Sequence, residues 1–406
     1  MDTIAEPTPR LPVDIDKEPL VEAAAALYPT LRRWHAEIER EQRFVPPLVD
    51  ALRAGGFYRL LIPRTLGGLE VDPLTYLRVA ERLAEGCGSV GWNIANNCIA
   101  QLISLGLPDD GIDELHGRGP AIIAGTAVQG GGEAVPVDGG YRVRGRWPFG
   151  TGCQEAAWML GSFQVLDDGT PRKNLDGSPL YRRGIFRRSE AEIVPGSWDV
   201  AGMRGTGSFD WTVDDVFLPE RRTVPHVGVQ LDNEWSRWPG LTYALPGQAW
   251  VGPHHSAVIT GIARAGIDAL IELATEKTPR GRTQRLADDP QVQEAVGRAE
   301  AMLTAGRAGR TAMITELWNM LAAGRRTTLE QRARCRLAST HAADSARGAM
   351  DLMYRHGGST SFRRDSRLAE CWRDLQVVGQ TVTLAPEWYP IAARVYLGLD
   401  PGPRLR

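Results

Sequence analysis

The sequence predicts an α+β protein of several domains, with helices at both ends of the chain and strands in the middle. From residue 19 to 118 the apolar residues recur every three or four positions, which is the spacing of amphipathic helices. From 119 to 232 the pattern changes to short alternating runs separated by Gly-Gly and Asp-Gly turn signals. From 254 to 398 long helical patterns return, and they predict a C-terminal four-helix bundle.

These changes of pattern divide the 406 residues into four parts. A chain of this length is expected to form two or three domains rather than one core. We expect a loose N-terminal segment at 1–18, an N-terminal helical domain at 19–118, a central β-domain (a barrel or a sandwich) at 119–232 and a C-terminal helical bundle at 233–406.

Composition and charge exclude several classes of protein. A net charge of −2 argues against a nucleic-acid-binding protein. No run of about 18 apolar residues could span a membrane, and the first residues lack the basic and apolar regions of a secretion signal. The five cysteines form no Cys-x-x-Cys pair, so we expect reduced, buried thiols in a cytoplasmic protein.

Common cofactor and metal motifs are missing. The chain has no Gly-x-Gly-x-x-Gly opening a helix after a strand, and no phosphate loop ending in Gly-Lys-Ser/Thr. His254 and His255 are the only adjacent histidines, and consecutive side chains diverge on a helix. We therefore predict that the protein binds no metal.

The segment 139–153 carries the strongest functional signal. A Gly-Gly turn and an alternating strand lead through Trp147 into the small-residue loop Gly150-Thr151-Gly152. Such a loop is expected to leave backbone N–H groups and one hydroxyl free to face a flat, hydrogen-bonding cofactor, with an aromatic wall beside it. Further along the chain, the glycine-rich segment 202–208 leads into a strand at 210–219.

Together these two segments resemble the middle domain of the acyl-CoA dehydrogenase superfamily. More closely, they resemble its branch of two-component flavin-dependent monooxygenases, which hydroxylate phenols and related aromatics. Segments 54–70 and 88–92 are similar to the N-terminal helical domain of that family, and 357–358, 372–374 and 394–400 to its C-terminal helical domain. The resemblance covers nearly the whole chain.

The resemblance implies an enzyme that receives reduced FMN or FAD from a separate flavin reductase, since the chain has no nicotinamide-binding fingerprint. Such an enzyme reacts with O2 through a C4a-hydroperoxyflavin and oxygenates a small substrate, here an aromatic or amine-bearing molecule. It would be a homotetramer, with the flavin between the β-domain and the C-terminal bundle.

The resemblance also assigns cofactor-binding positions. The loop residues would meet the flavin ring, with the Thr151 hydroxyl near flavin N5, and guanidinium groups suit phosphate oxygens. From the residues alone, the loop at 150–152 could instead be a plain turn. The segment 280–282 could be a solvated charge run at a helix start, and 357–361 could be a helix-capping turn. The assigned positions are Trp147, Thr151, Gly152, Arg280, Arg282, Gln293, Gly357, Gly358 and Ser361.

The chain departs from the family at both histidines that usually handle the substrate proton. Ala100 and Thr381 occupy those positions, and neither can take a proton near neutral pH. Either the substrate needs no protein base, or His254, His255 or His356 supplies it, or the reduced flavin serves another reaction. We predict Thr151 and Thr381 as catalytic positions, and a substrate pocket formed by Trp92, Asn96, Asn97, Ala100, His254 and His255.

Two other functions remain open at this stage. A dehydrogenase of the acyl-CoA type needs a carboxylate, but 381–383 has none, and Glu387 is expected at a helix start instead. A non-catalytic flavoprotein could use a basic surface, but acidic residues interleave with the arginines, which predicts a solvated helical face. Those arginines are Arg307, Arg310, Arg325, Arg326, Arg332, Arg334 and Arg336.

Overall fold

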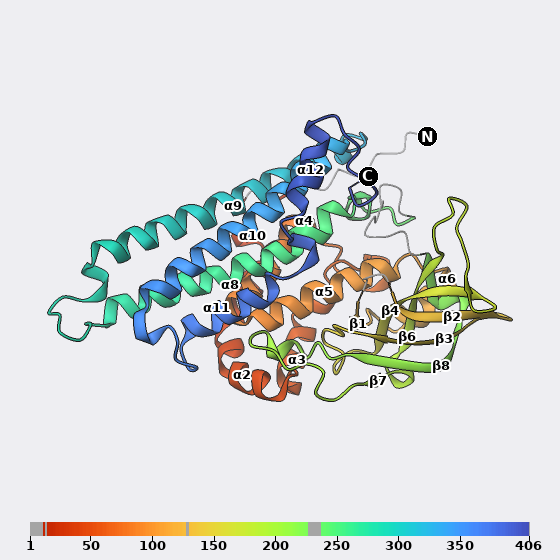
Figure 1. Ribbon diagram of the computed structural model, residues 1–406, viewed down its shortest axis with the longest axis horizontal. Coiled ribbons are helices and arrows are strands. Elements are labelled where there is room, and N and C mark those ends of the chain that lie inside the picture. Colours follow the sequence, from red (N-terminus) through yellow and green to blue (C-terminus); the bar gives the residue numbers. More distant parts are fainter. Residues whose placement is uncertain (1–10, 13, 127–129, 226–236, 406) are drawn as a thin grey trace. The chain divides into compact units, whose positions relative to one another are not determined.

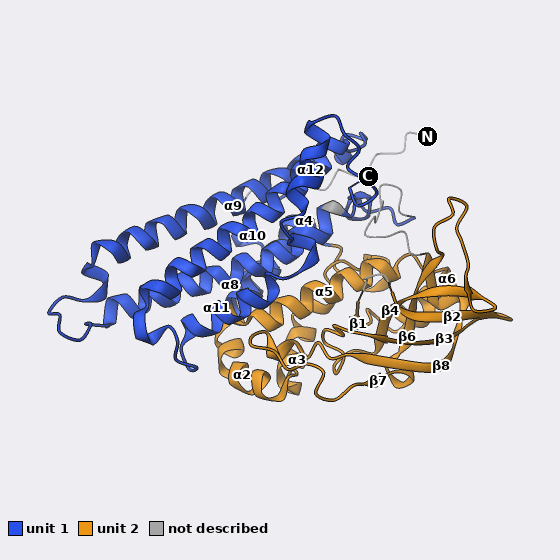
Figure 2. Ribbon diagram, viewed as in Figure 1, with its two compact units in different colours: residues 1–26, 71–85, 230–406 blue, residues 27–70, 86–229 orange. Residues whose placement is uncertain are grey.

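The computed structural model describes residues 11–12, 14–126, 130–225 and 237–405, which form two compact units (Figures 1 and 2). Unit 1 comprises 1–26, 71–85 and 230–406, and unit 2 comprises 27–70 and 86–229. The helix at 73–86 thus groups with the C-terminal helices, whereas the other helices expected in 19–118 group mainly with the strands.

Unit 1 is a bundle of long helices. In the bundle α10 packs against α8, α9, α11 and α12, and α8 also packs against α11. Its helices are α1 (Pro19–Ala26), α4 (Pro73–Gly86), α7 (Leu241–Ala244), α8 (Gln248–Glu276), α9 (Pro290–Ala322), α10 (Leu329–His356), α11 (Arg367–Val378) and α12 (Trp388–Tyr396). Side-chain caps set two of the starts: Asp289 accepts the N–H of Gln291 before α9, and Thr328 and Gln331 form a capping box before α10.

A buried ion cluster holds α4 in the bundle. The Glu81 carboxylate of α4 lies 2.5 Å from Nε of Arg307 and 3.3 Å from a terminal nitrogen of Arg310, both on α9. A buried carboxylate without these partners would be strongly destabilising, so the cluster requires α4 to stay with the bundle. Arg310 is 4% exposed, which corrects the expectation that it belongs to a solvated face.

Unit 2 combines four helices with one hydrogen-bonded sheet. The helices are α2 (Tyr28–Glu41), α3 (Pro46–Ala54), α5 (Gly88–Ser104) and α6 (Asp109–His116). The strands are β1 (Ile123–Gly125), β2 (Gly131–Val137), β3 (Gly140–Trp147), β4 (Trp158–Asp167), β5 (Thr170–Pro171), β6 (Tyr181–Arg187), β7 (Glu192–Ile193), β8 (Trp211–Pro219) and β9 (Thr223–Pro225). Their order is β7-β8-β3-β2-β4-β6-β9, with β1 and β5 paired to β4.

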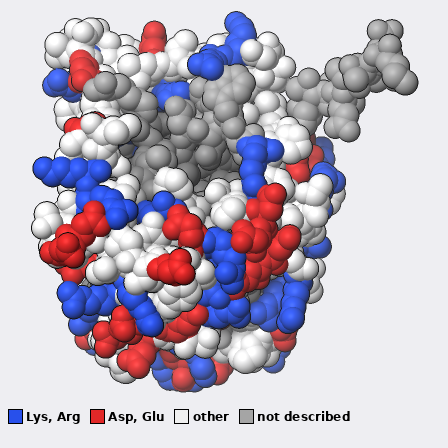
Figure 3. Space-filling model, turned by 90° about the vertical axis from the view of Figure 1, so that its right-hand side faces the viewer, with Lys and Arg blue, Asp and Glu red and all other residues white. Residues whose placement is uncertain are grey.

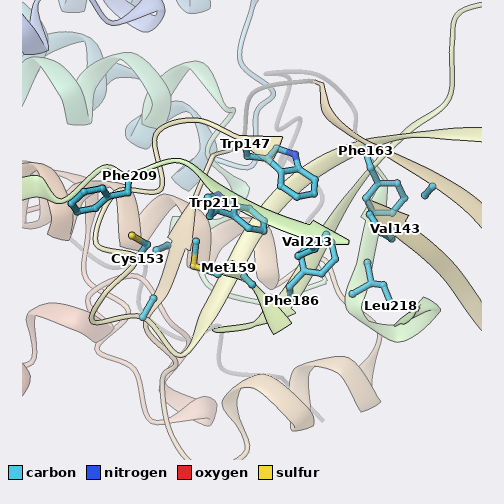
Figure 4. Close-up of a cluster of buried hydrophobic side chains, with 14 of the residues drawn as sticks. Val143, Trp147, Cys153, Met159, Phe163, Phe186, Phe209, Trp211, Val213 and Leu218 are labelled. Atoms are coloured by element: carbon cyan, nitrogen blue, oxygen red, sulfur yellow. The ribbon is translucent and has the colours of Figure 1, made fainter. Parts of the chain in front are cut away.

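The core of the sheet is aromatic (Figure 4). Trp147 of β3 and Trp211 of β8 are fully buried, and their rings stack with centroids 4.3 Å apart. Gly161 of β4 provides the space for this pair, because a Cβ there would lie 2.8 Å from an atom of each indole. Phe163 and Phe186 complete the cluster from the neighbouring strands.

The predicted order of helices, strands and helices is confirmed, and so is the acyl-CoA dehydrogenase-like fold class. All five cysteines are free and buried. None of the helices in the described residues is long and apolar enough to cross a membrane. On the face displayed in Figure 3, basic and acidic side chains are intermixed.

Candidate active site

The two glycine-rich segments that stand out in the sequence lie side by side. Because β3 pairs with β8, the loop that leaves β3 meets the segment that enters β8. The Gly150 N–H donates to the Phe209 carbonyl at 2.8 Å, and the Gly152 N–H donates to the Thr206 carbonyl at 3.0 Å. These bonds hold the loop at 149–153 against 206–209.

A row of buried hydroxyls joins the two segments. Oγ1 of Thr151 lies 2.8 Å from Oγ of Ser208. Ser208 donates to Oγ1 of Thr206 at 2.8 Å, and Thr206 donates to the Met203 carbonyl at 2.8 Å. Thr151 is 9% exposed, against 3% for Ser208 and 1% for Thr206, so Thr151 is the most exposed residue of the row. Ser208 and Thr206 were not predicted as site residues, although they lie in the second motif.

The expectation that the loop leaves backbone N–H groups free is wrong. Besides the two bonds to 206–209, the Thr151 N–H donates to the Phe149 carbonyl at 2.8 Å, and the Cys153 N–H donates to the Gly150 carbonyl at 2.9 Å. The backbone donors of 150–153 therefore serve to shape the loop. The side-chain hydroxyl of Thr151 is a polar group that this loop can offer a ligand.

Trp147 is placed as a core residue. Its indole is fully buried against Trp211, and Nε1 donates to the Ser162 carbonyl at 2.7 Å. The side chain thus fixes the end of β3, from which the loop starts. Gly152 has a φ of +71°, and a Cβ there would lie 3.3 Å from the Asn93 amide nitrogen on α5. The loop and α5 are therefore in close contact.

Helix α5 carries two buried asparagines on one face, and each has one side-chain atom without a hydrogen-bond partner. Asn93 is 6% exposed, and its Oδ1 is buried without a hydrogen-bond partner. Asn97, one helical turn on, accepts the Ile123 N–H at 2.9 Å through Oδ1, while its Nδ2 has no partner. Sequence analysis predicted Asn97 but missed Asn93, whose spacing of four residues could have indicated it.

The other predicted pocket residues of α5 are placed differently. Ala100 is buried and lies on the same face as Asn93 and Asn97. Asn96 is half-buried, and its amide nitrogen donates to the Trp92 carbonyl at 2.9 Å. The Asn96 amide nitrogen is therefore satisfied within its own helix.

In unit 1, a second hydroxyl row connects Thr381 to a buried histidine. Nδ1 of His255 lies 2.5 Å from Oγ1 of Thr383, which lies 3.1 Å from Oγ1 of Thr381. His254 donates from Nδ1 to the Trp250 carbonyl at 2.6 Å, and the two imidazole centroids are 3.7 Å apart. Burial lowers the pKa of His254 to about 4 and that of His255 well below 6.5, so both rings are neutral at pH 7.

Arg336 lies next to this row. It is 1% exposed, its guanidinium carbon lies 3.7 Å above the Trp388 ring, and it donates to the Thr383 carbonyl at 2.9 Å. Burial lowers the pKa of Arg336 to about 9. The expectation of a solvated position for Arg336 is therefore wrong. The sequence did not indicate that Arg336 is buried, because an arginine on a helix is usually exposed to solvent.

The predicted phosphate contacts lie at exposed positions of unit 1. Arg280 and Arg282 lie in the turn after α8, and Arg282 pairs at 3.5 Å with Asp289. Gln293, in the first turn of α9, donates to the Ala287 carbonyl at 3.0 Å. These side chains are accessible to a ligand or to another chain.

The predicted turn at 357–361 is tied to the end of α8 by Lys277, which sequence analysis missed. The Lys277 ammonium donates to the Gly357 carbonyl at 3.2 Å and to Oγ1 of Thr360 at 2.9 Å. Gly358 has a φ of +61° and is exposed, whereas Ser361 is buried and donates to the Tyr354 carbonyl at 2.5 Å. The structure thus joins Lys277, at the end of α8, to the turn at 357–361.

Two residues that the sequence offered as alternatives, His356 and Glu387, lie at the ends of helices. His356 lies at the end of α10, where its Nδ1 is 2.8 Å from the Leu352 carbonyl. Glu387 stands before α12, as expected for a helix start, and pairs with Arg404 at 2.9 Å. Among the described residues, no group of three or more His, Cys, Asp or Glu side chains could hold a metal ion.

Comparison with known proteins shows the family of the chain. Residues 20–108 match the acyl-CoA dehydrogenase N-terminal domain, and residues 254–385 match the acyl-CoA dehydrogenase C-terminal domain. The chain belongs to the acyl-CoA dehydrogenase superfamily, in its branch of flavin-dependent monooxygenases.

The relatives within this branch match over almost their whole length. An indole-3-acetate monooxygenase from Pseudomonas putida is 32% identical, with 90% of each chain covered. The flavin-dependent monooxygenase oxygenase subunit HsaA from Mycobacterium tuberculosis is 29% identical over 95% of this chain and 97% of its own. The crystal structure of 3-HSA hydroxylase from Rhodococcus sp. RHA1 superimposes with a TM-score of 0.87 at 26% identity, covering 95% of this chain and 98% of that one.

Proposed function

We propose that this chain is the oxygenase component that takes reduced FMN or FAD from a separate flavin reductase and uses O2 to oxygenate a small aromatic substrate. The observation that carries the proposal is the buried hydroxyl row ending at Thr151 in a loop braced against 206–209. The indole-3-acetate monooxygenase relative supports an aromatic substrate, and the HsaA relative, named as the oxygenase subunit of a flavin-dependent monooxygenase, supports the type of reaction.

The residues around Thr151 fit a flavin ring. A bound flavin would supply the activation of O2, which no protein side chain can provide. Gly152 leaves the loop without a side chain, and the Asn93 amide lies directly behind it. Thr151 Oγ1 can accept a hydrogen bond, and the isoalloxazine edge of a reduced flavin carries N–H groups that need an acceptor. Trp147 would act by fixing the start of the loop from the core.

The buried amides of α5 fit a neutral substrate. Oδ1 of Asn93 can accept a hydrogen bond and Nδ2 of Asn97 can donate one. Both atoms are buried without a protein partner. Buried uncharged amides would orient the O–H or N–H of a phenol, an indole or an amine. We assign Trp92, Asn96 and Ala100 to the walls of this pocket.

A row of hydroxyls leads from Thr381 to a neutral imidazole although both usual histidines are missing. Thr381 can pass a proton to Thr383, and Thr383 can pass one to the neutral His255. Their separations of 3.1 and 2.5 Å are within hydrogen-bond range. We therefore assign Thr381 to contact the substrate and His255 to receive its proton. A dehydrogenase would need a carboxylate at 381–383, and that segment has none.

Two exposed arginines and their polar neighbours in unit 1 suit a flavin phosphate. Arg280, Arg282 and Gln293 lie near each other in the chain around the α8–α9 connection, and Gly357, Gly358 and Ser361 form the turn bound by Lys277. We assign these groups to the phosphate and ribityl part of the cofactor in a homotetramer. Five free cysteines fit the reducing cytoplasm, where we place the enzyme.

Isotope labelling tests the reaction type. The protein would be supplied with chemically reduced FMN or FAD, 18O2 and a panel of phenols and indoles. We expect one 18O atom in the product of each substrate that is turned over. A product that has lost hydrogen without gaining 18O would contradict the proposal.

A further inference from the structure

A buried arginine of unit 1 supports the segment at 381–388. Arg336 of α10 is 1% exposed, and its Nη1 donates to the Thr383 carbonyl at 2.9 Å. The ring of Trp388 covers the guanidinium, with 3.7 Å between the guanidinium carbon and the ring centroid. On α8, a Cβ at Gly252 would lie 2.6 Å from Nη1, so the glycine leaves room for the guanidinium. The guanidinium is thus enclosed between α8 and this segment.

The positive charge of Arg336 has no acidic partner among the described residues. Its charged neighbour is a second cation, Arg404, and the nearby imidazoles of His254 and His255 are neutral. Nε of Arg336 is buried without a hydrogen-bond partner. Burial lowers the pKa of Arg336 to about 9, so the group stays protonated at pH 7. The bundle therefore encloses a cation whose charge is not offset.

Arg336 differs in this respect from Arg310, a second buried arginine of unit 1. A buried cation is strongly destabilising unless an anion and hydrogen bonds offset its lost hydration. Arg310 lies 3.3 Å from the Glu81 carboxylate and donates to Oγ1 of Thr260 at 3.1 Å. Arg336 has one carbonyl and an aromatic ring instead. A bound ligand can supply the anion that Arg336 needs.

The substrate position assigned above lies next to Arg336. Thr383 accepts from Arg336 through its carbonyl, and Oγ1 of Thr383 lies 3.1 Å from Oγ1 of Thr381. Both threonines are partly exposed, and we assign Thr381 to contact the substrate. The guanidinium therefore lies directly behind the segment that meets the substrate. A ligand group held there is shielded from water, where a charge-assisted hydrogen bond is strongest.

We infer that Arg336 binds a carboxylate of the substrate, which makes small aromatic carboxylates the preferred substrates over neutral aromatics. This inference rests on the proposed function, in which Thr381 contacts the substrate. Nε and a terminal nitrogen of a guanidinium form a planar fork that can donate two parallel hydrogen bonds to one carboxylate. In Arg336 the Nε of this fork has no protein acceptor. Arg336 is thus a specificity-determining residue, which recognises the side arm of the substrate and takes no part in the oxygen chemistry.

Two matched substitutions test the role of the charge. Arg336→Met removes the charge, keeps most of the side-chain length and leaves no acid without a partner, so this variant should fold. Its dissociation constant for indole-3-acetate should rise about ten- to hundredfold, the range for a charge-assisted hydrogen bond, while that for indole-3-acetamide stays nearly unchanged. Arg404→Met is the control, because Arg404 covers the same Trp388 ring at 4.4 Å but pairs with the exposed Glu387.

Equilibrium dialysis of the full chain with each probe measures binding without turnover. The wild type and Arg404→Met should bind indole-3-acetate about tenfold or more tightly than indole-3-acetamide, and Arg336→Met should lose this preference. If circular dichroism shows that Arg336→Met does not fold, Gly252→Ala takes its place. Its new Cβ displaces Nη1 while the charge remains, so the preference for the acid should again fall.

Two results would overturn the inference. One is a wild type that binds the acid no more tightly than the amide, and the other is an unchanged preference in the folded variant of Arg336 or Gly252. Neither result bears on the reaction type, which the 18O experiment tests separately. A clear preference for the acid in a protein that incorporates no 18O would instead contradict the proposed function and leave carboxylate binding in place.

Discussion

The hydroxyls of Thr151 and Ser208 lie 2.8 Å apart although 57 residues separate them in the chain. The contact joins the loop after β3 to the segment before β8, and it is the point where the two glycine-rich motifs meet. The first prediction follows from this contact.

Replacing Thr151 by Ala should shorten the lifetime of the oxygen-reactive state. The variant loses the acceptor that we assign to flavin N5, so the transient near-ultraviolet absorbance seen after oxygen is added should decay roughly three- to tenfold faster. Stopped-flow absorbance measures this decay. Thr151→Ser, which keeps the hydroxyl, should decay like the wild type, and equal decay in Thr151→Ala would argue against the assignment.

Replacing Gly152 by Ala should weaken flavin binding. The new Cβ would lie 3.3 Å from the Asn93 amide nitrogen at a φ of +71°, so the loop would shift. Left-handed backbone costs a non-glycine residue about 1 kcal/mol. Gly139→Ala is a matched control, because φ is +76° there and a Cβ would meet nothing within 4 Å.

Both variants should therefore lose about 1 kcal/mol of unfolding free energy. Only Gly152→Ala should also bind reduced flavin more weakly, by about tenfold or more, as titration would detect. Equal flavin affinity in the two variants would remove Gly152 from the proposed site.

Replacing Asn93 by Leu should separate stability from function. Oδ1 of Asn93 is buried without a partner, so its removal should leave the unfolding free energy unchanged or raise it by about 1 kcal/mol. Substrate KM should rise about tenfold, because one oriented hydrogen bond is lost. Denaturant titration and steady-state kinetics check the two effects.

Asn97→Leu provides the contrast for that prediction. Asn97 accepts the Ile123 N–H at 2.9 Å, so this variant leaves a buried donor unsatisfied and should lose about 1–3 kcal/mol. A large loss of stability in Asn93→Leu would mean that the Asn93 amide is structural.

Replacing Thr383 by Val should uncouple oxygen consumption from product formation. The change breaks the connection between Thr381 and His255 but leaves both residues in place. Product per O2 consumed should fall several-fold, with the remainder recovered as hydrogen peroxide, while flavin affinity is unchanged. Unchanged coupling in Thr383→Val would show that the reaction needs no proton transfer through this row.

Acid should destabilise the protein partly through His116. This histidine is 2% exposed, and burial lowers its pKa from 6.5 to about 4. Between those values the unfolded state binds more protons, so His116 contributes stability that is present above pH 6.5 and is lost as the pH falls toward 4. The full loss is roughly 3 kcal/mol.

Denaturant titrations at several pH values test this contribution. His116→Gln should show a smaller decrease in unfolding free energy between pH 7 and pH 4.5 than the wild type. An identical decrease in both proteins would mean that His116 is not the titrating group.

Sequence reasoning recovered the fold because the evidence for it is local. The alternating residues of β3 and the helical periods of α8 and α9 are properties of short segments, and turn glycines mark their ends. The grouping of α4 with the bundle could not be predicted, because it depends on Glu81 meeting Arg307 and Arg310 across a long stretch of chain.

The contacts of the candidate site were harder to predict than the loop that carries it. Thr151 and Gly152 were identified from their motif, whereas the use of the loop N–H groups depends on which carbonyls face them after folding. In the sequence, a tryptophan at position 147 could either line the flavin ring or belong to the core. The pairing of β3 with β8 places it in the core, stacked on Trp211. Ser208 and Asn93 become functional candidates only through contacts that span distant segments.

The reaction of the reduced complex with oxygen tests the central claim most directly. The wild-type protein would be mixed anaerobically with reduced FMN or reduced FAD and then exposed rapidly to O2 while near-ultraviolet absorbance is followed. If the protein is an oxygenase component, one of the two flavins should give a transient absorbance band that lasts longer than the oxidation of the free flavin. That flavin is the one that the enzyme uses. Immediate oxidation with no transient band for both flavins would contradict the assignment.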